Sequence, residues 1–170
     1  MGDNTISPRT TNYELSAQPS ALERVEKDVI EEHPNMVFVC FGLNDMRFGT
    51  PVEVFKEDLE QVLIKIIHQL PNTKIILTNV FHMTGWDRYT PRDRGSIAHT
   101  KNYNQAIEKL GVKYQLPLAD VSEAMAFQDY LIHEDGVHGN DLGHRIIGHR
   151  VFETIVQHTK ILNVDIPPDV

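Results

Sequence analysis

Long hydrophobic segments are missing from this sequence. The longest apolar runs, such as residues 37–41 and 75–77, fall far short of the roughly 20 residues that a membrane-spanning helix needs. The residues after Met1 are polar, so the apolar stretch of a signal peptide is absent as well. We therefore expect no membrane partner and predict a cytoplasmic protein.

Basic residues and cysteine are also scarce. The chain has 16 Lys and Arg against 24 Asp and Glu, which gives a net charge of -8, and its basic residues form no stripe. Because nucleic-acid binding relies on clustered positive charge, we expect no nucleic-acid partner. Cys40 is the single cysteine, so no internal disulfide can form, which fits a reducing compartment. Its place inside an apolar run predicts a small buried residue of a strand.

The marks of a second domain are absent too. The chain has 170 residues, of which 41% are hydrophobic and 24% are charged, and these are ordinary values for a globular protein. A chain of this length can bury one sizeable core but is short for two. No repeat, low-complexity segment or linker interrupts it. We therefore predict a single domain over residues 1–170, in which residues 1–19 form an irregular N-terminal segment.

Periodicity predicts helices that alternate with strands. Residues 20–33 place apolar side chains at helical spacing behind a Ser20 cap, with Glu23 three residues further on. Residues 36–41, MVFVCF, form the kind of continuous apolar run that is typical of a strand covered on both faces. Because strands separated by helices pair in parallel, we predict a three-layer α/β sandwich. The other predicted elements are helices over residues 50–70, 97–116 (which Gly111 can interrupt) and 141–158, and strands over residues 74–80 and 117–121.

The segments that follow the strands are the first place to look for a site, because ligands of open α/β sheets bind outside the carboxyl ends of the strands. After the first strand comes FGLND, in which Asn44 can present its amide over the strand ends. The alternative is an ordinary turn, since turns commonly use Gly, Asn and Asp. After the next strand comes a long polar loop with Trp86 and Tyr89, for which a substrate-facing role is one interpretation.

A third candidate is the segment Asp135-Gly-Val-His138. The Asp135 carboxylate can orient the His138 ring while the ring takes a proton from a hydroxyl nucleophile. The alternative is a helix entrance, in which Asp135, Asn140 and Asp141 cap free N–H groups and His138 has no role of its own. The residues by themselves leave both interpretations open.

Histidines are frequent in the same region, which raises the question of a metal. The nine histidines include His133, His138, His144 and His149. His144 and His149 are five residues apart and so lie on different sides of a helix, and neither a cysteine pair nor an HExxH pattern is present. We therefore predict no metal site.

Four segments, taken in order, resemble the SGNH hydrolases, also called GDSL-type esterases and lipases. They are VFVCFGLND, KIILTNV, YNQAIEKLGVKYQLPLADVSEAM and DGVHGNDLGHRIIG, and the resemblance covers residues 20–158. It implies a flavodoxin-like α/β/α fold, hydrolysis of a small acyl ester or a carbohydrate acetyl ester, and no metal or organic cofactor. It also implies that Asn44 donates to the oxyanion, that His138 is the general base and that Asp135 orients it.

The N-terminus departs from this family, whose members begin with an apolar strand that runs into Gly-Asp-Ser, with the serine as nucleophile. Here the chain begins MGDNTISPRT, and Asn4, which cannot act as an alkoxide, stands at the serine's position if this stretch is aligned with that motif. The alternative register sets NYELSAQPSALERV against the family's second segment, with Glu14 and Ala17 in place of its glycines. On that register the first strand and the nucleophile lie upstream of Met1.

Two functions from different classes remain open. One is an SGNH-type esterase, complete or truncated, that acts on a small-molecule ester. The other is a non-catalytic binding or structural protein that keeps the fold. The nearby hydroxyls of Ser7, Ser16 and Ser20 are more simply explained by a turn, a loop and a helix cap. A sheet without its first strand would also leave an unpaired edge, so we expect a homo-oligomer joined along that edge.

Overall fold

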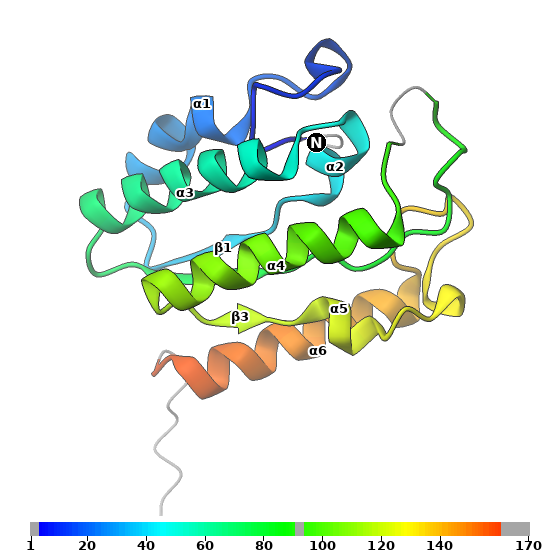
Figure 1. Cartoon of the computed structure of the whole chain (residues 1–170). Helices are drawn as coiled ribbons and strands as arrows, with labels where there is room; N and C mark the ends of the chain where they lie inside the picture. Colours follow the sequence, from blue (N-terminus) through cyan, green and yellow to red (C-terminus); the bar gives the residue numbers. More distant parts are fainter. Residues whose placement is uncertain (1–3, 91–93, 161–170) are drawn as a thin grey trace, which may run out of the picture.

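A parallel sheet forms the centre of the molecule, as a computed structural model shows (Figure 1). The structure describes residues 4–90 and 94–160, and within them three strands lie in the order β1-β2-β3, all parallel. The strands are β1 (Met36–Val39), β2 (Lys74–Thr78) and β3 (Leu118–Ala119), and the α-helices are α1 (Ala21–Val25), α2 (Leu43–Phe48), α3 (Val52–Gln69), α4 (Ile97–Tyr114), α5 (Val121–Met125) and α6 (Asp141–His158). Shorter elements are the 3-10 helices η1 (Tyr13–Leu15) and η3 (Asp129–Leu131) and the π-helical η2 (Glu26–Ile30), which continues α1.

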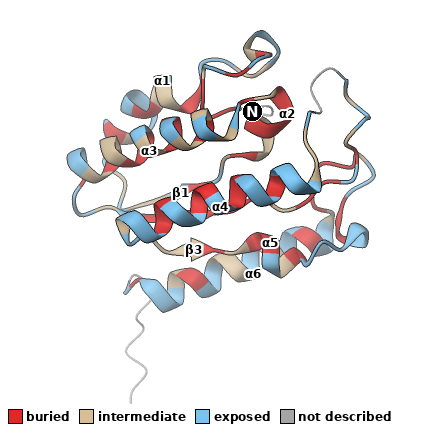
Figure 2. Cartoon of the chain, viewed as in Figure 1, coloured by how far each residue is buried: buried red, intermediate tan, exposed pale blue. Residues whose placement is uncertain are grey.

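Helices lie on both faces of the sheet. Val39 of β1 pairs with Leu77 of β2, and because side chains alternate along a strand, both point to the face that carries α1, α3 and α4. There they join the larger apolar cluster of the molecule (Figure 2). On the other face α6 packs along β3 and α5, next to a smaller apolar cluster around Met125. The predicted three-layer α/β/α sandwich with a parallel sheet is confirmed.

Two helices were missed by the sequence patterns, namely α2 in the FGLND segment and α5 after β3. The first forms because the chain turns at Gly42 and then buries Met46 and Phe48. The expected interruption of α4 at Gly111 is wrong, because this glycine is buried inside a continuous helix and packs against Leu77. Within the residues that the structure describes, no helix combines the length and the apolar character that a membrane span requires.

Strand β1 is less covered than its apolar sequence predicted. Phe38 is 39% exposed, and Cys40, just after the strand, is also exposed. The predictions of a strand covered on both faces and of a buried cysteine are therefore wrong. The reason is position: β1 is an edge of the sheet, and α6, on the face to which Phe38 points, packs against β3 at the opposite edge.

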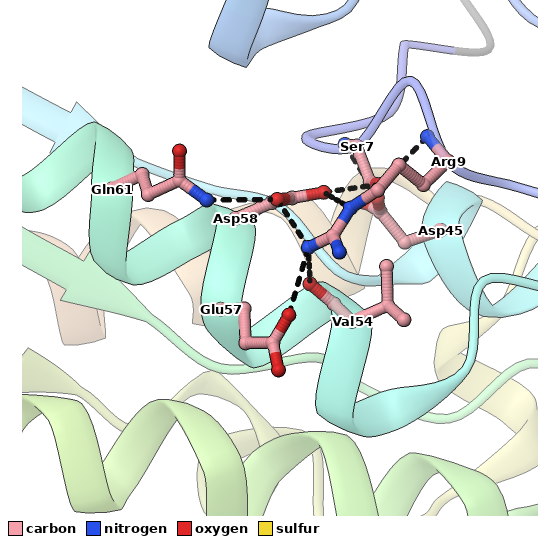
Figure 3. A network of polar contacts seen from close by, with 7 residues as sticks. All are labelled: Ser7, Arg9, Asp45, Val54, Glu57, Asp58 and Gln61. Atoms are coloured by element: carbon pink, nitrogen blue, oxygen red, sulfur yellow. Dashed lines mark hydrogen bonds and ion pairs between the residues drawn. The ribbon is translucent and has the colours of Figure 1, made fainter.

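Two buried carboxylates hold the irregular N-terminal segment that precedes α1. The backbone N–H groups of Ile6 and Ser7 donate to Asp45 of α2 over 2.9–3.2 Å. The Ser7 hydroxyl donates to Asp58 of α3 at 2.6 Å, and the Arg9 guanidinium binds the same carboxylate at 2.5 and 3.0 Å (Figure 3). The segment is thereby fixed to α2 and α3 although its residues 4–19 form no strand or α-helix of their own.

Burial dominates the ionisation of Asp45. Removal of this carboxyl group from water raises its pKa from 3.8 to about 7, although the N–H groups of Ile6 and Ser7 favour the charged form. Between these two pH values the folded state binds more protons than the unfolded state. The contribution of Asp45 to the free energy of unfolding therefore falls as the pH rises through this window.

We expect this slope to reach the order of 1 kcal/mol per pH unit. Asp45→Asn removes the titrating group and resembles the protonated carboxyl in shape, so the variant should lose less stability than the wild type as the pH rises from about 4 to about 7. Urea unfolding at several pH values in this window measures both curves. Parallel curves for the two proteins would show that Asp45 does not carry the slope.

Candidate active site

Asn44 lies just beyond the carboxyl end of β1, in the first turn of α2. The chain reaches it through Gly42, whose φ of +120° favours glycine and where a Cβ atom would lie 2.8 Å from Val80 Cγ2. The Asn44 Nδ2 donates to the carbonyl oxygen of Asn4 at 3.1 Å, and its Oδ1 accepts from Arg47 Nη1 at 3.2 Å. The amide is therefore held in one orientation from both sides.

Asp135 and His138 form the pair that their spacing suggested. The His138 Nδ1 lies 2.7 Å from Asp135 Oδ2, while Asp135 Oδ1 accepts from the N–H groups of Val137 and His138 at 2.8 and 2.9 Å. The His138 side chain is 69% exposed, against 29% for Asp135. The ring is thus tethered at Nδ1, and most of its surface faces solvent.

The environment of Asp135 keeps it ionised. Partial burial acts to raise the pKa of this carboxyl group, but the N–H groups of His138 and Val137, together with the His138 ring, outweigh burial and hold the pKa well below its usual range. A carboxylate that stays charged at neutral pH can orient the ring and stabilise its protonated form.

Asn140, which follows the Asp135–His138 pair, caps the N-terminus of α6. The Asn140 Oδ1 accepts from the N–H groups of Leu142 and Gly143 at 3.1 and 3.0 Å. The expected role of Asn140 as a cap is confirmed, whereas Asp141 lies in the first helical turn, beyond the cap position. Asp135 caps the turn before the helix and binds the ring as well, so its two interpretations are compatible.

The loop after β2 holds the Asp135 turn in place, a feature that the sequence did not reveal. The carbonyl oxygen of Gly136 accepts from the N–H groups of Thr84 and Gly85 at 2.8 and 2.9 Å, and the Tyr89 hydroxyl donates to the carbonyl oxygen of Asp135 at 3.1 Å. At Gly136, with φ +75°, a Cβ atom would lie 2.7 Å from Gly85 Cα. The two backbones therefore cross too closely for a side chain.

Arg47 connects Asn44 with the loop that holds the Asp135 turn. This arginine is 5% exposed, it donates to Asn44, and its Cζ lies 5.6 Å from the centre of the Tyr89 ring. Tyr89 in turn binds the backbone of Asp135. The structure thus brings Asp135 and His138 into direct contact and joins Asn44 to them through Arg47 and Tyr89. Sequence analysis missed Arg47, because its spacing from Asn44 becomes meaningful only once α2 is known to be a helix.

Trp86 contributes less to an open site than its loop position suggested. It is partly buried against the main apolar cluster, and its ring packs against Gly95 at the base of the loop. The substrate-facing interpretation of this loop therefore concerns Tyr89, which touches the Asp135 turn, more than Trp86.

The serines near the N-terminus are engaged in structural hydrogen bonds. Ser7 and Ser20 are 0% exposed, and Ser20 exchanges a capping box with Glu23, as its sequence position predicted. The Ser16 hydroxyl donates to the carbonyl oxygen of Tyr13 at 2.7 Å. Among residues 4–90 and 94–160, no hydroxyl forms a hydrogen bond with the His138 ring.

The residues that distinguish the two sequence registers lie in different places in the structure. The structure brings Asn4 against the Asn44 amide, and Asn4 pairs with Ala17 in an isolated parallel bridge. Glu14, which the second register puts at a glycine position, is exposed on η1. Gly2 and Asp3 lie outside the described residues.

In the described part of the chain, no three His, Cys, Asp or Glu side chains lie close enough together to bind a metal ion. His133 does approach the pair, with its Nδ1 3.5 Å from Asp135 Oδ2. A cavity of about 350 Å³ lies elsewhere, between the end of α2 and the first turns of α4, and its lining includes Met46, Arg94 and His99 but none of the three candidate site residues.

Replacement of Gly136 tests the crossing of the two loops. Gly136→Ala adds a left-handed alanine and a clash with Gly85, so we expect the free energy of unfolding to fall by about 2 kcal/mol. The matched control is Gly148→Ala in α6, where a Cβ atom meets nothing within 4 Å and stability should rise by up to about 1 kcal/mol. Urea unfolding compares the two; equal effects would mean that the crossing is not tight.

A model of the GDSL-like lipase/acylhydrolase family matches residues 2–146. The crystal structure of a lipase/acylhydrolase from Enterococcus faecalis has a TM-score of 0.66 and 27% sequence identity, over 79% of this chain and 67% of that chain. The crystal structure of the acetyl xylan esterase AlAXEase has a TM-score of 0.66 and 22% sequence identity, over 79% of this chain and 74% of that chain. A catalytic variant of an acetylxylan esterase from Geobacillus stearothermophilus has a TM-score of 0.63 and 19% sequence identity, over 79% of this chain and 65% of that chain. The chain thus spans about two thirds of the first and third of these structures. No curated protein matches it in sequence.

Proposed function

Because the chain belongs to the GDSL-like lipase/acylhydrolase family, we propose that it hydrolyses small acyl esters, with carbohydrate acetyl esters as the preferred class. The observation that carries the proposal is the 2.7 Å contact between His138 Nδ1 and an ionised Asp135, with the rest of the ring open to solvent. Two of the similar structures are acetylxylan esterases, which supports the substrate class.

The proposed chemistry begins with the tautomer of His138. The hydrogen bond to Asp135 holds the proton on Nδ1, so Nε2 is left as an acceptor that faces solvent. There it removes the proton of the nucleophile as the ester carbonyl is attacked, and it later returns the proton to the departing alcohol. Asp135 stays charged throughout and stabilises the imidazolium.

Asn44 is the proposed oxyanion donor. One N–H of its amide is directed at the carbonyl oxygen of Asn4, and the second N–H is the group that we assign to the oxyanion. Such a donor is worth about 3 kcal/mol in the transition state. Arg47 is a positioning residue, because its bond to Oδ1 prevents the amide from turning over.

A non-catalytic role is the second candidate, and one observation favours it. No described hydroxyl meets the His138 ring, and the N-terminal serines serve the fold. A protein that keeps the Asp135–His138 pair without a nucleophile could still bind an acylated ligand. The test of the first candidate must therefore detect the nucleophile as well as turnover.

Hydrolysis of 4-nitrophenyl acetate and of an acetylated xylo-oligosaccharide measures the proposed activity. We expect His138→Ala and Asp135→Asn each to lower kcat by about 10³–10⁴-fold, because they remove the base or its orientation. His149→Ala, on the surface of α6, serves as the control and should be unaffected. A fluorophosphonate probe, located by peptide mapping, tests for the nucleophile: an adduct on one hydroxyl of the wild type that is absent from His138→Ala would identify it.

Two results would contradict this assignment. A folded wild type with neither turnover nor a covalent adduct would favour the binding role. Activity that survives His138→Ala would mean that another group is the base.

The oxyanion assignment has a test of its own. Asn44→Ala should lower kcat by about 10²–10³-fold with little change in KM, because the lost hydrogen bond forms in the transition state. Arg47→Met should give a smaller loss of the same kind, since the amide remains but can turn over. A rise in KM with constant kcat in both variants would instead assign Asn44 to ground-state binding.

A further inference from the structure

The cavity between the end of α2 and the first turns of α4 has a polar lining that the proposed ester hydrolysis does not use. Its volume is about 350 Å³, and its lining includes the side chains of Thr50, Arg94, His99 and Asn102. A cavity of this size lies at the lower end of the range that holds small ligands. None of the described residues that line it is acidic, although the chain carries a net charge of -8.

Arg94 is fixed against the end of α2. Its backbone N–H donates to the carbonyl oxygen of Arg47 at 3.2 Å. Its Cδ lies 2.9 Å from the position of a Cβ atom at Gly49, where φ is +84°, so a glycine at this point lets the arginine side chain pass close to the backbone. Because a planar guanidinium can bind both oxygens of a carboxylate, Arg94 is suited to hold an anionic group in the cavity.

Thr50 lines the same cavity and has a hydroxyl group that needs a partner. The residue is 4% exposed, and among residues 4–90 and 94–160 its Oγ1 forms no hydrogen bond. Its backbone, by contrast, is satisfied, because the N–H donates to the carbonyl oxygen of Asp45 at 2.8 Å and the carbonyl oxygen accepts from the Tyr103 hydroxyl. A buried hydroxyl without a partner is costly, and a polar ligand in the cavity can supply that partner.

His99 and Asn102 add two further polar groups from α4. They lie three residues apart in the sequence, so they project from the same side of the helix. The Ser96 Oγ accepts from the backbone N–H of His99 at 3.1 Å and lies 3.2 Å from its Nδ1. With the Ser96 hydroxyl donating to Nδ1, the neutral ring carries its proton on Nε2. The His99 ring and the Asn102 amide then both present N–H donors.

We propose that this cavity binds a sugar acid of monosaccharide size. Arg94 binds the carboxylate of this ligand, and Thr50, His99 and Asn102 bind its hydroxyl groups. Met46, which also lines the cavity, offers an apolar surface to the C–H groups of the ring. The proposal does not depend on ester hydrolysis, because the cavity lining includes neither Asp135 nor His138.

The number and the charge of the polar groups decide the class of ligand. One guanidinium matches the single charge of a carboxylate, whereas a phosphate dianion would meet no second fixed cation among the described lining residues. The donors of Thr50, His99 and Asn102 exceed what one carboxylate can use. Hydroxyl groups on the same ligand would employ them, because a hydroxyl both accepts and donates hydrogen bonds.

Amide chemical shifts of the isotope-labelled protein, titrated with D-glucuronate, test the proposal. We expect saturable shifts at Gly49, Thr50 and His99 with a Kd on the order of 1 mM, which corresponds to an ordinary binding energy per atom for a ligand of this size. D-glucose, in which a hydroxymethyl group replaces the carboxylate, should bind at least about tenfold more weakly. Acetate, which lacks the ring and its hydroxyl groups, should also bind at least about tenfold more weakly.

Substitutions separate the carboxylate contact from a general effect of charge. Arg94→Gln should raise the Kd for D-glucuronate at least about tenfold, and Arg94→Lys, which keeps the charge but loses the planar fork, should raise it less. The matched control is Arg145→Gln at an exposed position of α6, which removes the same charge from the protein and should leave the Kd unchanged. His138→Ala should also leave it unchanged, because the cavity is separate from the candidate active site.

The Thr50 hydroxyl has a test that compares binding with stability. Thr50→Val should raise the Kd for D-glucuronate about threefold to tenfold, because one hydrogen bond to the ligand is lost. The free energy of unfolding of the ligand-free protein should not fall, since the replaced hydroxyl has no hydrogen bond within the described residues. Loss of stability without loss of binding would show that this hydroxyl serves the fold instead of a ligand.

Four further results would overturn the proposal. The first is the absence of saturable shifts at Gly49 and Thr50 up to about 20 mM D-glucuronate. The second is a Kd that Arg94→Gln leaves unchanged, or D-glucose binding as tight as that of D-glucuronate, since either means that the carboxylate is not recognised. The third is equally tight binding of acetate or inorganic phosphate, which would indicate an anion site without sugar recognition. The fourth is a set of shifts centred on His138 and lost in His138→Ala.

Discussion

The buried carboxylate of Asp45 is the contact on which the arrangement at the end of β1 depends. It receives the backbone N–H groups of Ile6 and Ser7 at the start of a helix that begins immediately after the strand. Without an acceptor at this point, these N–H groups would be buried and unsatisfied, which is costly. The same contact brings Asn4 next to the Asn44 amide. One buried carboxyl group therefore anchors the N-terminal segment and sets the surroundings of a candidate oxyanion donor.

The candidate site is assembled from loops that follow different strands, and each loop constrains the next. The Asp135 turn is held by the backbone of Thr84 and Gly85 from the loop after β2, and Tyr89 of that loop lies against Arg47 of α2. Such a network lets the fold hold exposed groups in a defined geometry, because the constraint acts on backbone atoms and buried side chains. His138 can remain open to solvent while the carboxylate that orients it is fixed from several sides.

Strand β1 links the sheet to the candidate site. Among residues 4–90 and 94–160, no strand pairs with the outer edge of β1, the strand that carries Asn44 beyond its carboxyl end. A strand that pairs with this edge of β1 would therefore have one end beside Asn44.

Sequence patterns by themselves determined the order of the three strands and the longer helices, the parallel sheet, and the caps at Ser20 and Asn140, and they placed Asp135 and His138 within reach of each other. All of these depend on spacing within a few residues, or on the match between apolar period and secondary structure. Tertiary structure decided the rest: the burial of Asp45, the crossing of Gly85 over Gly136, and the exposure of Phe38. These depend on which segments meet across long separations, 40 residues in the contact of Asn44 with Asn4. Local periodicity does not encode the path of a loop or the position of a strand at the edge of a sheet, because both are set by packing among elements that are distant in the chain.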